Sequence, residues 1–373
     1  MNTYKYNIGG YDWGCQTNRI ILTMDDVIEE INKEDLIIRE TTLISDFKNK
    51  TINEITAKRN ISDYRLIDEH NIEIELEVGP KFLSPAVFSF ETMKNRWSNP
   101  YSLTIHYKDE MINRKSGQTT DADCFEINNY ICKDGTIYPY GYYHNNSDTL
   151  LVWLHGLSEG ECSQSDPRLT ILINRVQSLC NEFQDYVSCD LLIPQCPTYW
   201  MDDDGKESNL NGGRIIAGRT SYYKESLKEL IESFNKKHII LVGASNGGYM
   251  ALYMGLEYGD MFDAIIPICE GFPDEHIRNE QINKILSTPL FFIYSNDDYV
   301  VDPKKFEILT IERLRNKGAL NLKVATTDHV YFNIEGHKVK TSGHRSWIYF
   351  FNNEASDDET GIKVFDWLKG IIK

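Results

Sequence analysis

The sequence lacks any apolar run long enough to cross a membrane. No stretch approaches the roughly 18 apolar residues of a membrane helix, and no early segment joins basic residues to a long apolar run. We therefore expect neither a membrane helix nor a signal peptide. We expect a cytoplasmic location. Internal repeats and low-complexity tracts are missing too, so nothing indicates a repeat protein or a disordered linker protein.

Positive charge is scarce: the chain has 39 Lys and Arg residues and 56 Asp and Glu residues, which gives a formal net charge of −17. A nucleic acid or an anionic membrane surface would repel such a chain, so we expect neither as a partner. The eight cysteines include no C-x-x-C pair and no spacing typical of a zinc site. Most should therefore be reduced and buried, and we expect no metal and no other cofactor.

Residues 238–248, HIILVGASNGG, carry the most functional information. A run of β-branched and aliphatic residues ends in Gly243-Ala244-Ser245-Asn246-Gly247, which matches the G-x-S-x-G pattern. The bare pattern also occurs by chance in unrelated proteins, where it is an ordinary glycine-rich turn. Here, however, a strand-like run precedes it and an apolar helical run, 249–256, follows it. Small residues on both sides let the backbone take strained angles and project the hydroxyl. Ser245 is therefore the candidate nucleophile.

A serine nucleophile of this kind is followed in the chain first by an acid and then by a histidine. The apolar run 289–294 leads into Ser295-Asn296-Asp297-Asp298. Hydrolases of this class often have the acid at the fourth residue after the strand, a valine three residues later and a proline two residues after that. Counting from Tyr294 selects Asp298, followed by Val301 and Pro303. Asp297 stays the alternative, within a loop of turn-forming acidic residues.

Three histidines, His329, His337 and His344, come late enough to complete the set. We favour His344 because it lies in a loop of small residues, 341–343, ahead of an aromatic run; His337 also follows a glycine and is the runner-up. In the predicted mechanism His344 takes the proton of Ser245, while the acid holds the imidazole in the correct tautomer. A neutral serine is otherwise a poor nucleophile.

Two backbone amides should stabilise the oxyanion of the tetrahedral intermediate. One is the N–H of Asn246, and the other should follow the strand 149–154, where His155-Gly156-Leu157 resembles the H-G motif of lipases. We assign the second donor to Leu157, with Gly156 as the alternative, and expect His155 to be structural.

An aromatic pair precedes the helix that leads to the serine. Tyr199 and Trp200 are candidates to line an acyl or aromatic pocket, with packing in the core as the alternative.

With these motifs in order, residues from about 125 to 373 resemble an α/β-hydrolase of the carboxylesterase, feruloyl esterase and polyhydroxyalkanoate-depolymerase-like group. The resemblance implies a mostly parallel sheet flanked by helices and a serine esterase activity. More narrowly, the whole chain resembles bacterial esterases with an immunoglobulin-like domain ahead of the hydrolase, through Tyr11-Asp12-Trp13-Gly14 and residues 97–105.

Length supports two domains, because a minimal hydrolase needs only about 200–250 residues. The first 120 residues contain β-branched or alternating runs, of which 72–78 alternates strictly, and few helical patterns. We therefore predict an immunoglobulin-like β-sandwich over 1–120 and an α/β-hydrolase domain over 121–373. Residues 116–121 have the composition of a linker. A hairpin, 125–132 with 136–143, should open the hydrolase sheet, and helices are predicted over 169–183 and 221–234.

The leading functional hypothesis is a serine carboxylesterase acting on a small-molecule ester; a homo-oligomer is left open. A peptidase of prolyl-oligopeptidase type is the rival, but its propeller needs more than 120 residues. A third hypothesis is a non-catalytic polysaccharide- or partner-binding protein with a degenerate hydrolase domain, which the complete catalytic set argues against. The fold alone does not define the acyl or alcohol specificity.

Overall fold

The computed structural model describes residues 1–160, 166–211, 214–215, 218–334 and 336–372. They form two compact units. The first contains Met1–Cys124 together with Ile171–Gln177, and the second contains Phe125–Thr170 together with Ser178–Lys373.

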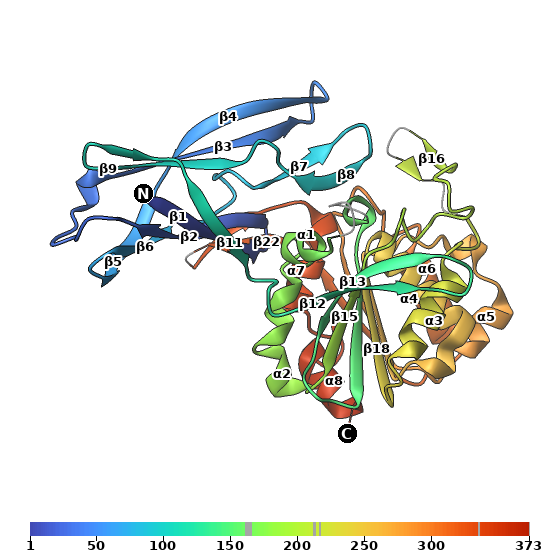
Figure 1. The fold of residues 1–373 in the computed structure, drawn as a ribbon. Coiled ribbons are helices and arrows are strands. Elements are labelled where there is room, and N and C mark those ends of the chain that lie inside the picture. The colour runs from blue at the N-terminus through green and yellow to red at the C-terminus, as the bar shows by residue number, and fades with distance from the viewer. Residues whose placement is uncertain (161–165, 212–213, 216–217, 335, 373) are drawn as a thin grey trace. The chain divides into compact units, whose positions relative to one another are not determined.

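The first unit consists of strands in two main sheets (Figure 1). In β6 the alternating sequence places Ile72, Ile74 and Leu76 in the core, as a half-exposed strand requires. One sheet has the order β11 (Lys115–Thr120), β1 (Thr3–Tyr11), β2 (Gly14–Thr23), β6 (Asn71–Leu76), β5 (Ile61–Asp68). The other has the order β10 (Glu110–Ile112), β9 (Ser102–Tyr107), β3 (Leu36–Asp46), β4 (Thr51–Arg59), and β7 (Ala86–Ser89) pairs with β8 (Lys94–Trp97).

The prediction of a linker over 116–121 is wrong for most of that segment, because Lys115–Thr120 forms strand β11. It pairs in parallel with β1, with Asn7 opposite Thr119, and the Thr119 hydroxyl donates a 2.8 Å hydrogen bond to Asn7 Oδ1. The strand lies at a sheet edge and most of its side chains are exposed. Its polar composition is therefore typical of a linker, although its backbone belongs to the sheet.

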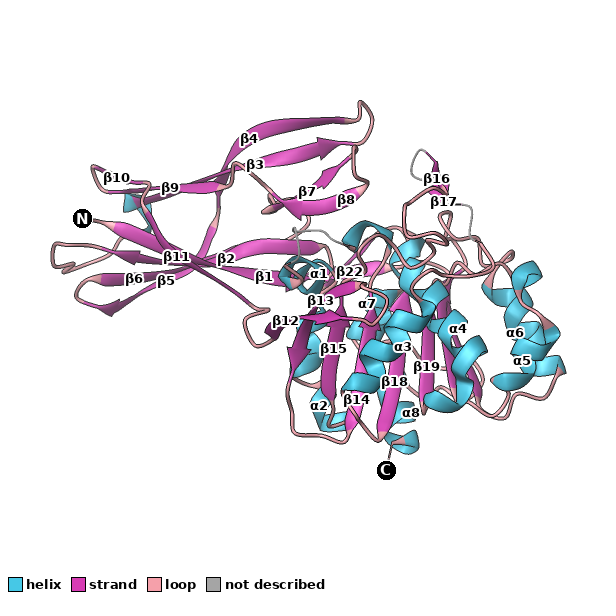
Figure 2. Cartoon of the chain, turned by 45° about the vertical axis from the view of Figure 1, so that its right-hand side comes forward, coloured by secondary structure: helices cyan, strands magenta, loops and turns pink. Residues whose placement is uncertain are grey.

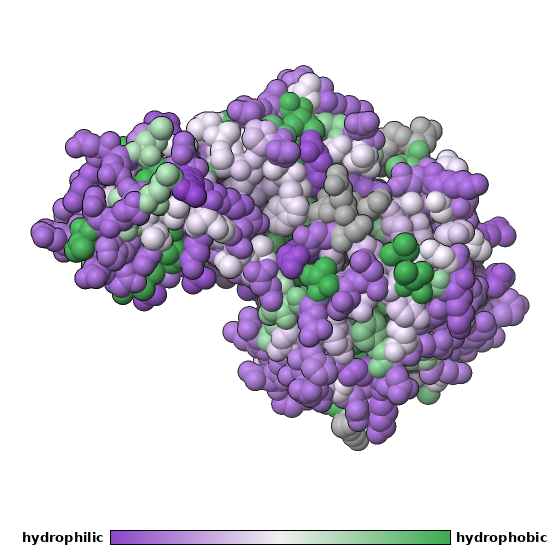
Figure 3. All heavy atoms as spheres, viewed as in Figure 1, coloured by the Kyte–Doolittle hydropathy of each residue, from purple (hydrophilic) through white to green (hydrophobic). Residues whose placement is uncertain are grey.

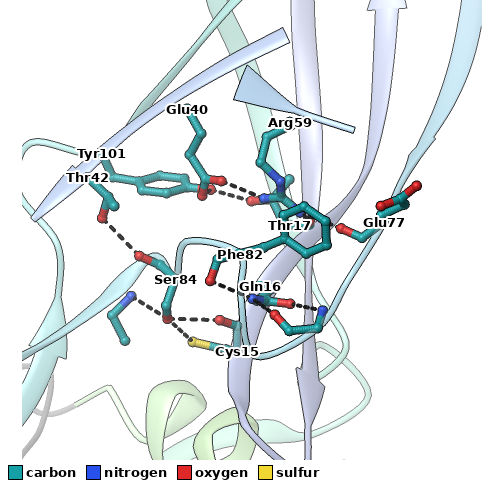
Figure 4. A network of polar contacts seen from close by, with 12 residues as sticks. Cys15, Gln16, Thr17, Glu40, Thr42, Arg59, Glu77, Phe82, Ser84 and Tyr101 are labelled. Atoms are coloured by element: carbon teal, nitrogen blue, oxygen red, sulfur yellow. Dashed lines mark hydrogen bonds and ion pairs between the residues drawn. The ribbon is translucent and has the colours of Figure 1, made fainter. Parts of the chain in front are cut away.

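A buried ion pair lies in the core of the first unit (Figure 4). Arg59 is 1% exposed and its Nη1 lies 2.5 Å from Glu40 Oε2, whose carboxylate is fully buried. The Tyr101 hydroxyl donates to Glu40 Oε1 at 2.7 Å, and Arg59 Nη2 donates to the carbonyl oxygens of Thr17 and Glu77 at 3.0 and 2.9 Å. Each buried charge thus has a partner and additional hydrogen bonds, which burial demands.

The second unit contains an eight-stranded sheet in which the first two strand pairings are antiparallel and the others are parallel. The central parallel strands are largely apolar; every residue of β14, for example, is buried, as in a sheet covered on both faces. The order is β12 (Glu126–Ile131), β13 (Ile137–Tyr143), β15 (Asp190–Pro194), β14 (Thr149–Leu154), β18 (His238–Ala244), β19 (Ala264–Ile268), β20 (Leu290–Ser295), β21 (Leu322–Thr327). The expected hairpin is present as β12 and β13.

Helices cover both faces of this sheet (Figures 1 and 2). One face carries α3 (Lys224–Ser233), α4 (Asn246–Tyr258), α5 (Asn279–Lys284) and α6 (Glu307–Asn316), and the other carries α2 (Phe183–Tyr186), α7 (Trp347–Phe351) and α8 (Val364–Ile371). Two short hairpins, β16 (Leu210–Asn211) with β17 (Arg214–Ile215) and β22 (Tyr331–Ile334) with β23 (His337–Lys340), lie outside the main sheet.

The prediction of a single helix over 169–183 is wrong. The segment forms α1 (Arg168–Ile173), a 3₁₀ turn over Val176–Cys180, and then α2. Arg175 between them has a φ of +61°, a left-handed conformation that ends a right-handed helix. The helix expected over 221–234 is confirmed as α3.

Among the described residues, no helix is long and apolar enough to cross a membrane. Figure 3 shows that hydrophilic residues cover most of the visible surface, which agrees with the excess of acidic side chains in the sequence.

We predict that Arg59→Met destabilises the first unit by about 3–5 kcal/mol, because Glu40 is left as a buried charge without its partner. Hydrogen exchange of peptides from β2 and β3 measures this local stability. Arg65→Met is the matched control: Arg65 also pairs with a glutamate, but its side chain is 72% exposed, so the loss should stay below about 1 kcal/mol. Equal losses in the two variants would contradict the prediction.

Candidate active site

Ser245 lies at a sharp turn between β18 and α4. Its φ is +56° and its ψ is −115°, a conformation that costs on the order of 1–3 kcal/mol for a residue with a side chain. Its N–H donates a 2.8 Å hydrogen bond to Ile268 O at the end of β19. The neighbouring glycines are sterically required, because a Cβ on Gly243 would lie 2.2 Å from Gly247 O and one on Gly247 would lie 2.0 Å from Leu154 O. This is the geometry of a nucleophile elbow.

The structure brings Ser245, His344 and Asp298 into one chain of hydrogen bonds. His344 Nε2 lies 2.9 Å from Ser245 Oγ, and His344 Nδ1 lies 2.7 Å from Asp298 Oδ2. The other carboxylate oxygen, Oδ1, accepts the N–H groups of Val300 and Val301 at 2.8 and 3.0 Å. Asp298 thus acts only as an acceptor, so the hydrogen between it and the ring belongs to Nδ1, and Nε2 is free to accept the serine proton.

The two alternative residues lie elsewhere. Asp297 Oδ2 contacts His329 Nδ1 at 2.7 Å and Lys340 Nζ at 3.2 Å, and the Ser295 hydroxyl donates to Asp297 Oδ1. His337 lies in the β22–β23 hairpin with an exposed side chain. Neither Asp297 nor His337 has a hydrogen bond to Ser245 among the contacts of the described residues.

The predicted oxyanion donors follow two adjacent parallel strands. Leu157 follows β14 and Asn246 opens α4 directly after β18, with Leu154 opposite Gly243. The N–H of Gly156, the alternative donor, is instead directed to Glu159 Oε2 at 3.2 Å. The side chain of Asn246 is fixed separately, since its Oδ1 accepts the N–H of Trp200 at 2.6 Å.

Tyr199 and Trp200 are both fully buried. The Trp200 ring stacks on Tyr138 with centroids 6.2 Å apart and packs against His155 at 5.3 Å, while the Tyr199 hydroxyl donates to Asn209. These contacts belong to the core in this conformation, and a role for the pair in a substrate pocket stays a prediction.

His155 joins two loops at the carboxyl edge of the sheet. Its Nε2 accepts the N–H of Cys196 at 2.9 Å and its Nδ1 lies 2.7 Å from Gly156 O, so the ring carries its hydrogen on Nδ1. With both nitrogens engaged by the backbone and no exposure to solvent, His155 has a structural position.

Sequence reasoning missed two buried carboxyl groups near the site. Glu270 follows β19 and Glu307 opens α6, and both are fully buried. Burial raises the pKa of Glu270 to about 8, although the Phe272 N–H donates to it. The pKa of Glu307 is raised well above its ordinary value, mainly by burial and further by the nearby carboxyl groups of Glu270 and Asp298. An acidic residue two positions after a buried strand was the only available sequence signal for Glu270.

Two groups of side chains in the described ranges have the spacing to hold a metal ion: Cys269 with Asp298 and His344, and the run Asp202-Asp203-Asp204. In the second group, Asp202 already accepts hydrogen bonds from Thr198 Oγ1 at 2.7 Å and the N–H of Glu207 at 3.1 Å.

Comparison with known proteins agrees with this architecture. The family model described as phospholipase/carboxylesterase matches residues 144–350, more than half of the chain. A solved structure described as a thermostable esterase has a TM-score of 0.74 at 16% identity, with 94% of this chain and 96% of that chain covered. Weaker likenesses include an esterase from Pyrococcus furiosus (TM-score 0.42, 15% identity, 67% and 91% covered) and a ferulic acid esterase (TM-score 0.41, 14% identity, 61% and 93% covered). No curated protein matches.

The sheet, its flanking helices and the elbow define an α/β-hydrolase. The chain belongs to the phospholipase/carboxylesterase family, and the protein is a carboxylic ester hydrolase.

We predict that Gly247→Ala destabilises the second unit by at least about 1–3 kcal/mol, because its Cβ meets the fixed carbonyl of Leu154. Hydrogen exchange of peptides from β14 and β18 measures the loss. Gly370→Ala is the control: it lies in α8 with open space around the new Cβ, and should change stability by no more than about 1 kcal/mol. A tolerated Gly247→Ala would mean that the elbow has room to relax.

A second prediction concerns pH. The folded chain keeps a proton on Glu270 up to about pH 8, whereas the unfolded chain releases it near the ordinary pKa of about 4.5. The folded state thus binds more protons between these values, so this group lowers stability as pH rises, by at most about 1.4 kcal/mol per pH unit.

The full-length Glu270→Gln variant should lose this contribution and show a shallower decline in stability from pH 5 to pH 8 in urea unfolding. The control is Glu359→Gln, whose side chain is 69% exposed. Parallel pH profiles for Glu270→Gln and the wild type would contradict the prediction.

Proposed function

We propose that the protein hydrolyses carboxylic esters through an acyl-enzyme on Ser245. The observation that supports this most directly is the chain of hydrogen bonds from Ser245 through His344 to Asp298, at 2.9 and 2.7 Å. Both distances lie within the range needed for proton transfer between positioned groups.

In the first half-reaction, Ser245 Oγ attacks the acyl carbon while its proton passes to His344 Nε2. The imidazolium is then stabilised by Asp298, and Nε2 returns the proton to the departing alcohol. Water repeats the same steps on the acyl-enzyme and releases the acid. Asp298 is 5% exposed and held by two backbone N–H groups, so its acceptor geometry is fixed before the reaction begins.

The N–H groups of Leu157 and Asn246 are the proposed oxyanion donors. Leu157 is preferred over Gly156 because the Gly156 N–H already has an acceptor in Glu159. Each such donor contributes about 3–4 kcal/mol to stabilising the transition state.

We also propose that the immunoglobulin-like domain ends and the hydrolase domain begins at about residue 120. Support comes from β11, the last strand of the first unit, which ends at Thr120. The strands of that unit lie in two main sheets rather than in radially repeated blades, so a propeller-gated peptidase gains no support.

The test compares Ser245→Ala, Asp298→Asn and Asp297→Asn on p-nitrophenyl esters of increasing acyl length. We expect Ser245→Ala to lower kcat by at least about 10³-fold, because the acyl-enzyme has no nucleophile. Asp298→Asn should lower kcat by about 10⁴-fold, because an amide favours the wrong imidazole tautomer. Asp297→Asn has the same chemistry at the adjacent residue and should retain most of the rate. Full activity in Ser245→Ala, or a larger loss in Asp297→Asn than in Asp298→Asn, would refute the assignment.

A further inference from the structure

The Cys269 thiol lies beside the proposed triad without a part in its chemistry. Cys269 directly follows β19, and Ile268 is paired with Ala244 of β18, so Cys269 and Ser245 leave neighbouring strands at the same level. The Cys269 side chain is fully buried and its φ is +38°, a sparsely populated conformation for a residue other than glycine.

Three different metal-binding atom types meet at this point. The sulfur of Cys269, a carboxylate oxygen of Asp298 and a ring nitrogen of His344 all lie within 4.8 Å of one another. In tetrahedral zinc sites the metal lies about 2.3 Å from sulfur and about 2.0–2.2 Å from nitrogen or oxygen, which places ligand atoms roughly 3.3–3.8 Å apart. The 2.7 Å separation of His344 Nδ1 and Asp298 Oδ2 has to open slightly and the sulfur has to approach.

The ligand atoms themselves favour a cation, because an oxygen of the Asp298 carboxylate lies within 4.8 Å of the Cys269 sulfur. Thiolate and imidazole are ligands that suit zinc, while a purely oxygen-coordinated ion such as Mg²⁺ would gain nothing from the sulfur.

We propose that Cys269, Asp298 and His344 form an inhibitory site for Zn²⁺, and this proposal rests on the proposed function of the triad. Zinc takes Cys269 Sγ, an Asp298 oxygen and His344 Nδ1 and leaves its fourth position open. The thiol proton leaves to solvent, and the ring proton of His344 moves from Nδ1 to Nε2. A protonated Nε2 cannot accept the Ser245 proton, so ester hydrolysis stops while zinc is bound and resumes when a chelator removes it.

The test measures zinc binding by equilibrium dialysis against ZnCl₂ and, separately, ester hydrolysis in the same buffers. The full-length wild type should bind zinc, lose most of its rate and recover the rate with EDTA. Cys269→Ala should bind zinc at least about 10-fold more weakly and keep its own zinc-free rate at concentrations that inhibit the wild type. Cys189→Ala removes another fully buried cysteine of the same unit and should behave as the wild type does.

His344→Gln removes the nitrogen ligand and should also weaken zinc binding in dialysis, where no activity is needed. If near-UV circular dichroism shows that Cys269→Ala does not fold, Cys269→Ser replaces it. Equal zinc inhibition of Cys269→Ala and the wild type, or equal zinc binding by His344→Gln and the wild type, overturns the proposal. An inactive wild type that still binds zinc through Cys269 would refute the esterase mechanism and leave the metal site supported.

Discussion

The close approach of the elbow to the end of β14 is the constraint on which the site depends. There is no room for a Cβ at Gly247, because Leu154 O would lie 2.0 Å from it. This contact sets α4 directly against the edge of the sheet and places Asn246, its first residue, beside the loop that carries Leu157. The strained backbone of Ser245 persists because β18 and α4, which flank it, are almost entirely buried.

A second contact without room for a side chain positions His344, the proposed base. A Cβ on Gly343 would lie 2.2 Å from Asp297 Oδ1 and 2.8 Å from Asp298 N, so the loop that carries His344 packs directly on the backbone of the acid loop. The two adjacent aspartates consequently face different partners: Asp298 meets the His344 ring, and Asp297 meets His329 and Lys340. The difference between their partners is therefore a property of loop packing and not of residue type.

The strands and the elbow were predictable because their signals are local. The apolar runs of β14 and β18 and the glycines around Ser245 carry their own information. The linker prediction over 116–121 was wrong, since polar side chains there do not reveal a backbone that pairs with β1. The single helix predicted over 169–183 is interrupted at Arg175, where no proline or glycine marks the break. Cys269, Glu270 and Glu307 escaped notice for a different reason, because their burial results from packing between strands and helices far apart in the chain.

The buried acidic residues near the proposed triad differ in their hydrogen-bond partners. Both oxygens of Asp298 have donor partners, two backbone N–H groups on one and the His344 ring on the other. Neither carboxyl oxygen of Glu307 and only one of Glu270 has a hydrogen-bond partner among the described residues, and burial raises the pKa of both groups. Burial thus favours the uncharged form of Glu270 and Glu307, because a negative charge on either would be desolvated without compensation. In the proposed mechanism, the positive charge that forms on His344 faces Asp298 at Nδ1, while Nε2 remains directed at Ser245.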